Sequence, residues 1–282
     1  MSLRVLCILL LASVSMTACA QTDSGAADDK ATDQAAASKG AAQSPPGAKA
    51  SGTPAANATA ALKKVNPNIV PERLGDAPLP GYQQAVVSGQ VIFISNDGRY
   101  LIQGAVFDID AKKNLGEAAM ASVRRELIRS VPGQDRIVFA PKDPRYTVTV
   151  FTDVECGFCR RFHDDIANYN RQGIAVEYLA FPRMGPASED FKIMEAVWCA
   201  KDRRQALSDA KKDRKVPATA RCTSPVARQY NLGQRAGLTG TPMILAEDGT
   251  MLGGYLPPAE LRAALDRHAA EVAKSGAASG GR

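Results

Sequence analysis

From residue 136 onward, short apolar runs alternate with segments whose apolar residues recur at helical spacing. Tyr146–Phe151 is rich in β-branched and aromatic residues, which predicts a buried strand, and Ile174–Phe181 predicts a second one. The segment between them predicts a helix that Gly173 ends. Its expected apolar face consists of Phe158, Phe162, Ile166 and Tyr169. Because a helix connects the two strands, we expect them to pair in parallel.

The rest of this half continues the alternation. The predicted elements are, in order, a helical region over 187–235, a hairpin of Met243–Ala246 with Thr250–Tyr255, and a closing helix over Ala259–Val272. The whole pattern predicts an α/β domain over residues 136–274. Residues 275–282 are expected to form a flexible tail.

Residues 62–113 carry a different, strand-rich pattern. Gln83–Ser95 predicts two short strands broken at Ser88-Gly89, and Asn96-Asp97-Gly98 predicts a hairpin turn that leads into further strand over Tyr100–Asp110. A block of this size buries little apolar surface and leaves strand edges open. We therefore predict an N-terminal dimerisation domain over 62–113.

A helix is predicted between the two halves, over residues 114–135. Asn114 is placed to cap its start, and Glu117 is placed three residues later, as in a capping box. Apolar residues follow at helical spacing until Pro132-Gly133. The pattern predicts a linker helix between the two domains, and an ordinary surface helix of either domain fits it nearly as well.

The chain begins with the layout of a secretory signal over residues 1–20. Arg4 precedes a short apolar run, and small residues follow it. Two cleavage points compete: one before Gln21, and one before Cys19, which would then be the lipidated first residue of a lipoprotein. Residues 21–61 are rich in Ala, Ser, Gly and Pro, which predicts a disordered spacer.

Composition and charge narrow the functional classes. The chain is 45% hydrophobic and 23% charged, which is typical of a globular protein. Its net charge of +6 comes from scattered basic residues that form no stripe with interleaved aromatics, so we expect no nucleic-acid partner. Export to an oxidising compartment would let disulfides persist among the cysteines that remain after processing.

The candidate chemistry lies in Cys156-Gly157-Phe158-Cys159, between a predicted strand and the helix that follows it. Unpaired backbone N–H groups and the helix dipole favour a negative charge at Cys156, which makes it the candidate nucleophile. Cys159 lies about one helical turn further on, where it can attack a mixed disulfide and release the substrate. Thiol–disulfide exchange of this kind needs no cofactor.

Two simpler interpretations of this motif remain open. In the first, the two cysteines are half of a zinc site, with His163 as a third ligand. A structural zinc takes about four ligands, however, and the sequence has no second pair of ligands nearby. A permanent structural disulfide is the other, although so short a loop adds little constraint. We expect no metal, and we expect His163 to be a solvated helix residue.

Gly240-Thr241-Pro242 precedes the Met243 strand. Alone it is a weak signal, because a proline that opens a strand is ordinary and its bond is usually trans. Combined with the upstream cysteine motif, it predicts a cis Thr241-Pro242 bond that faces the cysteines. Thr241 and Pro242 would then expose backbone groups that pair with an extended substrate chain.

The ordered motifs resemble one known family, the bacterial periplasmic disulfide isomerases of the DsbC/DsbG type in the thioredoxin-like superfamily. The resemblance runs from about Leu79 to Ala269, and the DsbC branch is the more similar. The matching segments are Ile102-Gln103-Gly104, Val150-Phe151-Thr152-Asp153 with the cysteine motif, Tyr178-Leu179-Ala180-Phe181-Pro182-Arg183, Trp198-Cys199-Ala200-Lys201-Asp202, Gly240-Thr241-Pro242, and Gly254-Tyr255 with Pro257-Pro258.

The resemblance implies a fold and a set of partners. The fold is a thioredoxin-like α/β catalytic domain with a helical insertion, preceded by a small α+β dimerisation domain and a linker helix. The partners are a second copy of the chain, misfolded disulfide-containing exported proteins, and a membrane thiol reductant of the DsbD type. Cys199 and Cys222 are implied to form a structural disulfide, with a buried free thiol at Cys199 as the alternative. Glu155 departs from the family, in which a small polar residue is expected before the nucleophile. Its carboxylate would modestly oppose a Cys156 thiolate if its charge points at Cys156.

The predicted function is the isomerisation of wrong disulfides in the periplasm, with the chain either free or tethered through Cys19. A dithiol oxidase is an alternative enzyme, although the extra N-terminal domain favours an isomerase. A non-catalytic holding chaperone is an alternative of another class.

Overall fold

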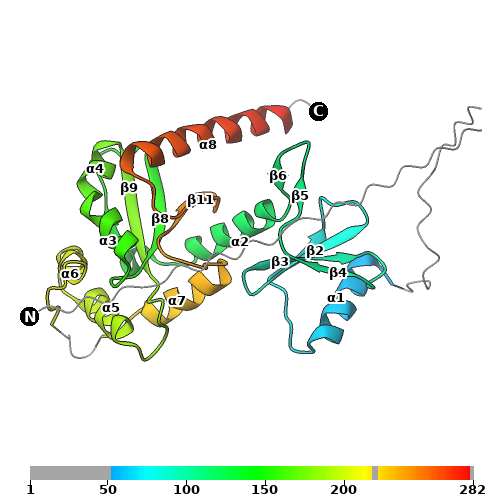
Figure 1. Cartoon of the computed structure of the whole chain (residues 1–282), viewed down its shortest axis with the longest axis horizontal. Coiled ribbons are helices and arrows are strands. Elements are labelled where there is room, and N and C mark those ends of the chain that lie inside the picture. The colour runs from blue at the N-terminus through cyan, green and yellow to red at the C-terminus, as the bar shows by residue number, and fades with distance from the viewer. Residues whose placement is uncertain (1–51, 218–221, 280–282) are drawn as a thin grey trace, which may run out of the picture. The chain divides into compact units, whose positions relative to one another are not determined.

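The computed structural model describes residues 52–217 and 222–279, with side chains described as far as Lys274 (Figure 1). The predicted signal peptide, the candidate lipidation site Cys19 and most of the predicted spacer lie outside these residues. Within the described ranges, no helix is both long and apolar enough to cross a membrane.

Helix α1 (Pro54–Val65) begins inside the segment predicted as spacer, so that prediction is wrong for its last part. Thr53 caps the helix by accepting a hydrogen bond from the backbone N–H of Ala56. Ala58 and Leu62 are buried in one apolar cluster with residues of the neighbouring sheet. Alanine is the best helix former, so an Ala-rich sequence with one well-placed leucine packs as a helix although it has few large apolar residues.

The N-terminal sheet is antiparallel, in the order β1-β2-β3-β4. Its strands are β1 (Arg73–Asp76), β2 (Tyr82–Val87), β3 (Gln90–Ser95) and β4 (Leu101–Gln103). The predicted break at Ser88-Gly89 is confirmed, because both residues have positive φ and form a two-residue hairpin turn. Gly98 has a φ of 71° in the next turn, as the Asn-Asp-Gly sequence predicted.

The strand predicted over Tyr100–Asp110 is interrupted. Gly104 has a φ of 135°, and the chain turns there between β4 and a separate two-stranded ribbon. The ribbon consists of β5 (Phe107–Asp108) and β6 (Lys113–Asn114). Among the strands that the structure describes, β4 therefore remains an edge of the four-stranded sheet, paired only with β3.

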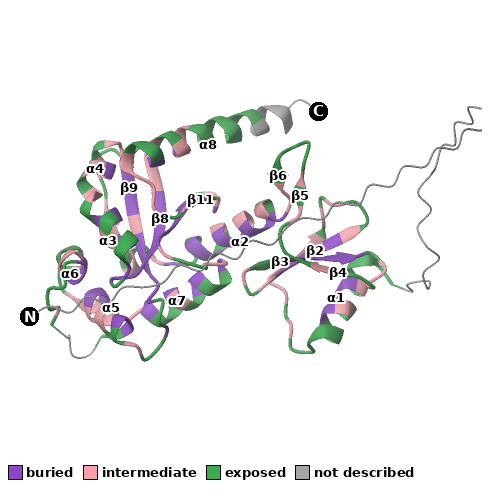
Figure 2. Cartoon of the chain, viewed as in Figure 1, coloured by how far each residue is buried: buried purple, intermediate pink, exposed green. Residues whose placement is uncertain are grey.

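The second half contains a five-stranded sheet in the order β11-β10-β8-β9-β7. Its strands are β7 (Ile137–Phe139), β8 (Tyr146–Thr152), β9 (Ile174–Ala180), β10 (Met243–Ala246) and β11 (Met251–Gly253). Strands β8 and β9 pair in parallel, as predicted, and the other neighbours are antiparallel. The two central strands are almost wholly buried (Figure 2). Their carboxyl ends form the edge at which the cysteine motif begins.

Helices pack on both faces of this sheet (Figure 1). They are α2 (Glu117–Arg129), α3 (Gly157–Asp164), α4 (Ile166–Arg171), α5 (Glu189–Cys199), α6 (Arg203–Ala210), α7 (Val226–Arg235) and α8 (Pro258–Ser279), with a short 3-10 turn at Gly133–Asp135. Helix α8 continues to Ser279, so the prediction of a flexible tail from residue 275 is wrong for its first residues.

Helix α2 corresponds to the predicted linker helix, but it also covers one face of the five-stranded sheet. Val123 and Leu127 share an apolar cluster with Phe151 and Leu179. The predicted capping box is wrong. Glu117 does not reach back to the start of the helix, because its Oε1 accepts a hydrogen bond from Nη1 of the buried Arg124 at 2.7 Å.

The helix that follows the cysteine motif is divided at Asp165 into α3 and α4. Phe162 and Tyr169 are fully buried, as their spacing predicted, and their rings stack on each other. Phe158 differs from the prediction, because 61% of it is exposed. A large aromatic side chain thus faces solvent in the middle of the cysteine motif.

Candidate active site

The end of β8 and the start of α3 together place the two cysteines. Cys156 is the N-cap of α3, with extended backbone, and Cys159 lies in the first turn. The first N–H groups of a helix have no intrahelical partners and so favour a negative charge at its start, where Cys156 lies, and the backbone N–H of Cys159 acts on the Cys156 sulfur. Both cysteines are free thiols, with 3% of Cys156 and 1% of Cys159 exposed.

The pKa of Cys156 is lowered to about 5. A hydrogen bond from the Cys159 thiol is the largest cause, and the Thr241 side chain, the backbone N–H of Cys159 and the positive charge of Arg183 lower it further against the opposing effect of burial. At neutral pH the Cys156 sulfur is therefore a thiolate. The thiolate is the reactive form of cysteine in disulfide exchange.

Cys159 has the opposite electrostatic character. Burial is the main cause that raises its pKa far above the ordinary thiol value, and its hydrogen bond to Cys156 is the next. One thiolate and one protonated thiol thus share a single turn of helix. At neutral pH, therefore, only the Cys156 sulfur is in the nucleophilic thiolate form.

The turn at Gly240–Pro242 lies against the Cys156 sulfur. The expected cis Thr241-Pro242 bond is present, and the Cys156 thiol, when protonated, donates a hydrogen bond to Thr241 O at 3.2 Å. Residues more than eighty positions apart in the sequence therefore form one site. The structure brings all four residues of the predicted site together: Cys156, Cys159, Thr241 and Pro242.

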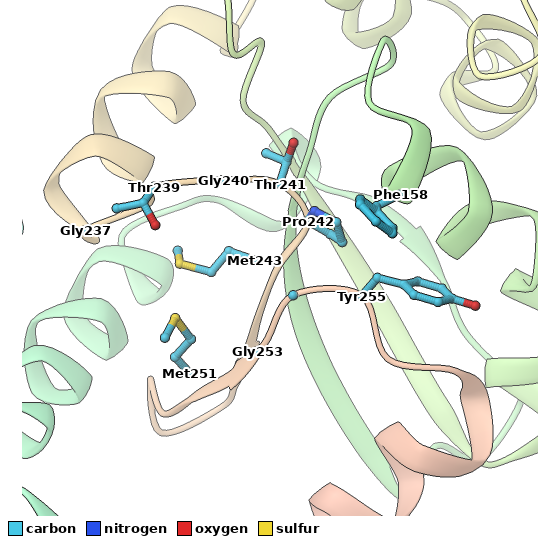
Figure 3. A pocket seen from close by; sticks show the side chains of 11 residues that line it. Phe158, Gly237, Thr239, Gly240, Thr241, Pro242, Met243, Met251, Gly253 and Tyr255 are labelled. Carbon is cyan, nitrogen blue, oxygen red and sulfur yellow. The ribbon is translucent and has the colours of Figure 1, made fainter. Parts of the chain in front are cut away.

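An open pocket of about 470 Å³ lies beside this turn (Figure 3). Phe158 and Tyr255 stack with their ring centroids 6.3 Å apart, and Pro242 lies next to them. Met243 and Met251 line the opposite part of the pocket. The apolar lining can take up side chains of a peptide whose sulfur approaches Cys156.

The negative charge of the Glu155 carboxylate, next to Cys156 in the sequence, is neutralised by an ion pair. Arg160 Nη2 lies 3.1 Å from Glu155 Oε2 and 2.6 Å from Asp213 Oδ1, so one guanidinium holds both acids. The pKa of Cys156 is lowered despite the neighbouring acid. The expected opposition from Glu155 is thus outweighed at this site.

Asp153 and Arg183 contribute to the site but were not singled out from the sequence. Asp153 is fully buried, and its Oδ2 accepts hydrogen bonds from Arg183 Nε at 2.8 Å and from the Arg183 backbone N–H at 3.1 Å. This pair fixes the loop after β9 against the cysteine loop and brings a cation close enough to lower the pKa of Cys156. The position of Asp153, between a strand and the cysteine motif, was the available signal.

The prediction that His163 is solvated is wrong, because only 3% of it is exposed. Its ring nitrogens lie 3.2 Å from Tyr178 OH and 2.9 Å from Ser208 Oγ, and burial lowers its pKa to about 3. His163 follows Cys159 by four residues, so both lie on the inner face of α3. Among the described residues, His, Cys, Asp and Glu side chains form no group of three that could hold a metal.

The remaining two described cysteines, Cys199 and Cys222, form a disulfide in the helical insertion. The pairing implied by the family resemblance is therefore present. The alternative of a buried free thiol at Cys199 does not hold.

A thioredoxin-type sheet, with a thiolate at the start of the helix after its central strand, defines a thiol–disulfide oxidoreductase. Two family models match the chain: a thioredoxin-like domain over residues 133–269, and the disulfide bond isomerase protein N-terminal domain over residues 33–117. The chain belongs to the DsbC family of thiol:disulfide interchange proteins.

The curated relatives match this chain over most of its length and over most of their own. The DsbC protein of Escherichia coli strain K12 is 37% identical over 194 residues, which is 68% of this chain and 80% of the relative. DsbC of Dickeya dadantii is 36% identical over 71% of this chain and 83% of the relative. DsbC of Haemophilus influenzae is 36% identical over 72% of this chain and 85% of the relative.

Among solved structures, a disulfide interchange protein from Neisseria gonorrhoeae matches with a TM-score of 0.43 and 25% identity, over 48% of this chain and 97% of that chain. A likeness at that TM-score adds nothing to the assignment. The N-terminal family match begins at residue 33, within the segment predicted as spacer.

Proposed function

We propose that this chain isomerises wrong disulfides in exported proteins, with Cys156 as the nucleophile and Cys159 as the resolving thiol. The observation that carries the proposal is the opposite ionisation of the two sulfurs: the pKa of Cys156 is lowered to about 5, whereas that of Cys159 is raised. A dithiol in this state can attack a disulfide at neutral pH and then pause before resolving the product.

The proposed reaction begins when the Cys156 thiolate attacks one sulfur of a substrate disulfide. That S–S bond breaks, the other substrate sulfur leaves as a thiolate, and a mixed disulfide forms. A different substrate thiolate can then attack the substrate sulfur bound to Cys156, which forms a new substrate disulfide and returns the Cys156 thiolate without net oxidation. Alternatively, Cys159 attacks Cys156, which releases a reduced substrate and leaves the enzyme oxidised.

Thr241 and Pro242 are proposed to hold the substrate chain beside Cys156. Thr241 O lies 3.2 Å from the Cys156 sulfur, and both residues line the apolar pocket. An extended substrate segment along this turn would present its disulfide to the thiolate, and neighbouring side chains would enter the pocket. The pocket selects by apolar character, which suits the exposed interiors of misfolded proteins.

The N-terminal domain is proposed to form a homodimer. Strand β4 is an edge strand, and four large apolar residues on it or close to it in the sequence are exposed. They are Tyr100, Leu101, Phe107 and Ile109, with exposed fractions between 38% and 85%. An open edge flanked by exposed apolar side chains favours pairing with a second copy.

The proposed location is the periplasm, and the proposed source of electrons is a membrane thiol reductant of the DsbD type. Both follow from the family and from the predicted signal over residues 1–20. Tethering through Cys19 is a further proposal on a residue outside the described ranges. The intact mass of protein from membranes tests it, because a lipidated Cys19 adds acyl mass, whereas cleavage before Gln21 removes Cys19.

Isomerisation is favoured over simple dithiol oxidation by the match to an isomerase N-terminal domain over residues 33–117. The exposed apolar pocket also suits a holding chaperone, so the test separates the two functions. A substrate protein with scrambled disulfides is incubated with the wild-type chain, with Cys156→Ala or with Cys159→Ala. We expect Cys156→Ala to lose recovery of the native substrate, and Cys159→Ala to accumulate mixed disulfides.

Suppression of aggregation of a cysteine-free client serves as the control measurement. We expect both variants to retain it, because neither substitution changes the pocket. Full recovery of the scrambled substrate by Cys156→Ala would overturn the enzymatic proposal.

A further inference from the structure

A buried lysine lies behind the cysteine motif. Lys211 follows α6 directly as its C-cap, and only 4% of it is exposed. Its Nζ donates hydrogen bonds to Thr152 Oγ1 at 2.9 Å and to Asp153 O at 3.3 Å. A buried ammonium is costly unless an anion compensates it, so its position calls for an explanation beyond packing.

Within the described residues, no carboxylate forms an ion pair with Lys211. Asp153 is the acidic residue that Lys211 contacts, but its two carboxylate oxygens accept hydrogen bonds from Arg183 and from the backbone N–H of Glu155. Of Asp153, Lys211 binds the backbone carbonyl oxygen and not the carboxylate. The Asp153 charge therefore stabilises the ammonium only at a distance, without an ion pair of its own.

Among the groups whose charge raises the pKa of Lys211, Cys159 has the largest effect. The backbone N–H of Asp153 faces Cys159, and the carbonyl of the same residue accepts from Lys211. Of the effects that lower the pKa of Cys159, the positive charge of Lys211 is the largest. Burial lowers the pKa of Lys211 itself to about 8. The ionisable and charged groups around Lys211 are Cys156, Cys159, Arg160 and His163 of the cysteine loop and α3, Asp153 after β8, Tyr178 of β9, and Lys212 beside it.

We propose that Lys211 is a positioning residue for the second half of the reaction, whose positive charge stabilises the Cys159 thiolate and so sets the lifetime of the mixed disulfide. The inference rests on the proposed roles of Cys156 and Cys159. Once Cys156 is bonded to a substrate sulfur, its negative charge and the hydrogen bond that it accepted from Cys159 are gone. Lys211 then acts on Cys159 without competition from the Cys156 thiolate.

The step balances without a further reactant. Cys159 loses its proton and attacks Cys156 Sγ, the bond between Cys156 and the substrate sulfur breaks, and the substrate thiolate leaves with the electron pair and takes up a proton. In this step Cys159 is oxidised and one substrate cysteine is reduced, Cys156 passes from the mixed disulfide to the enzyme disulfide without a change of oxidation state, and Lys211 is unchanged. A shorter-lived mixed disulfide favours this reductive exit over isomerisation, so Lys211 influences the balance between the two outcomes.

The test uses the reduced full-length chain and the aromatic disulfide dithionitrobenzoate, which releases one coloured thiolate when Cys156 attacks and a second when Cys159 resolves. The variants are Lys211→Met, Lys211→Gln, which keeps a hydrogen-bond donor without the charge, and Lys212→Met, which removes the neighbouring exposed charge. We expect both Lys211 variants to slow the second release about tenfold at neutral pH, because fewer Cys159 thiolates form. Lys212→Met should match the wild type.

The pH profile adds a readout that a merely structural role would not move. In the wild type, the rate of the second release should rise with pH and level off once Cys159 is fully ionised beside the Lys211 ammonium. In Lys211→Gln the rate should keep rising, because Cys159 ionises only at higher pH without that charge. A second release by Lys211→Gln within about twofold of the wild type would overturn the proposal, because hydrogen bonding would then suffice.

If neither Lys211 variant folds, a wild-type rate that rises without levelling up to about pH 9.5 would overturn it as well. Failure of the first release, by contrast, would count against Cys156 as the nucleophile and thus against the proposed function itself.

Discussion

At the scale of single residues, the site depends on a difference in ionisation between two neighbouring thiols. The folded pKa of Cys156, about 5, lies below its ordinary thiol value of 9.0. The thiolate therefore stabilises the reduced folded protein increasingly as pH rises above about 5, and this contribution is lost as pH falls through that value. We expect the free energy of unfolding of the reduced protein, relative to the oxidised one, to rise by up to about 1.4 kcal/mol per pH unit between about pH 5 and 8.

Urea unfolding of both redox forms at several pH values measures this difference. The oxidised protein is the matched control, because it carries the same carboxylates and histidines but no free thiol in the motif. A difference that stays constant over that range would contradict the ionisation of Cys156.

Arg183 gives a second prediction at this scale. We expect Arg183→Met to lower the free energy of unfolding by about 1–3 kcal/mol, because the buried Asp153 carboxylate keeps only its backbone N–H partners. The loss should be greater in the reduced form at neutral pH, since Arg183 also faces the Cys156 thiolate. In an Asp153→Asn background the same substitution should cost less, and equal costs in the two backgrounds would show that the pair is not coupled.

At the scale of elements, the disulfide stabilises the helical insertion. Cys199 ends α5 and Cys222 lies before α7, at a sequence separation of 23. We expect the double variant Cys199→Ala/Cys222→Ala to lose about 3 kcal/mol of stability, because the unfolded chain gains freedom. Urea unfolding followed by circular dichroism measures the loss. Disulfide exchange by the folded variant should remain near wild type, and an unchanged unfolding midpoint would show that the bridge adds nothing.

The elements themselves were largely predictable where their apolar pattern was strong. The parallel strands, the hairpin of β10 with β11 and the break between β2 and β3 followed from period and turn residues alone. Helix α1 and the end of α8 were not predicted, because small residues give little periodic contrast. The packing partners of α1, moreover, lie in strands that follow it in the chain. The division at Asp165 and the exposure of Phe158 likewise depend on neighbours that one element does not contain.

At the scale of the whole molecule, the sequence predicted which residues meet at the site but not what surrounds them. The cysteine motif and the Gly240–Pro242 turn were identified together from the order of their elements. Asp153 with Arg183, and Lys211 behind Cys159, were not, because each pairing joins segments brought together only by the folded sheet and the insertion. The buried cation is therefore a property of the tertiary structure, not of a motif.

Dimerisation is the prediction that belongs to this scale. We expect Phe107→Glu to convert a dimer into a monomer at micromolar concentration, because it places a charge among the exposed apolar residues near β4. Val70→Glu is the matched control, since Val70 is also exposed but lies outside that group. Sedimentation equilibrium distinguishes the two states. A Phe107→Glu variant that remains dimeric would place the subunit contact elsewhere.

The most direct test is the pH dependence of Cys156 alkylation in the reduced wild-type protein, with the modified residue located by mass spectrometry. Thiolate reactivity should rise with a midpoint near pH 5, and Cys159 should stay unmodified through neutral pH. Modification of Cys156 with a midpoint above about pH 8, the range of an ordinary thiol, or equal modification of both cysteines, would contradict the account.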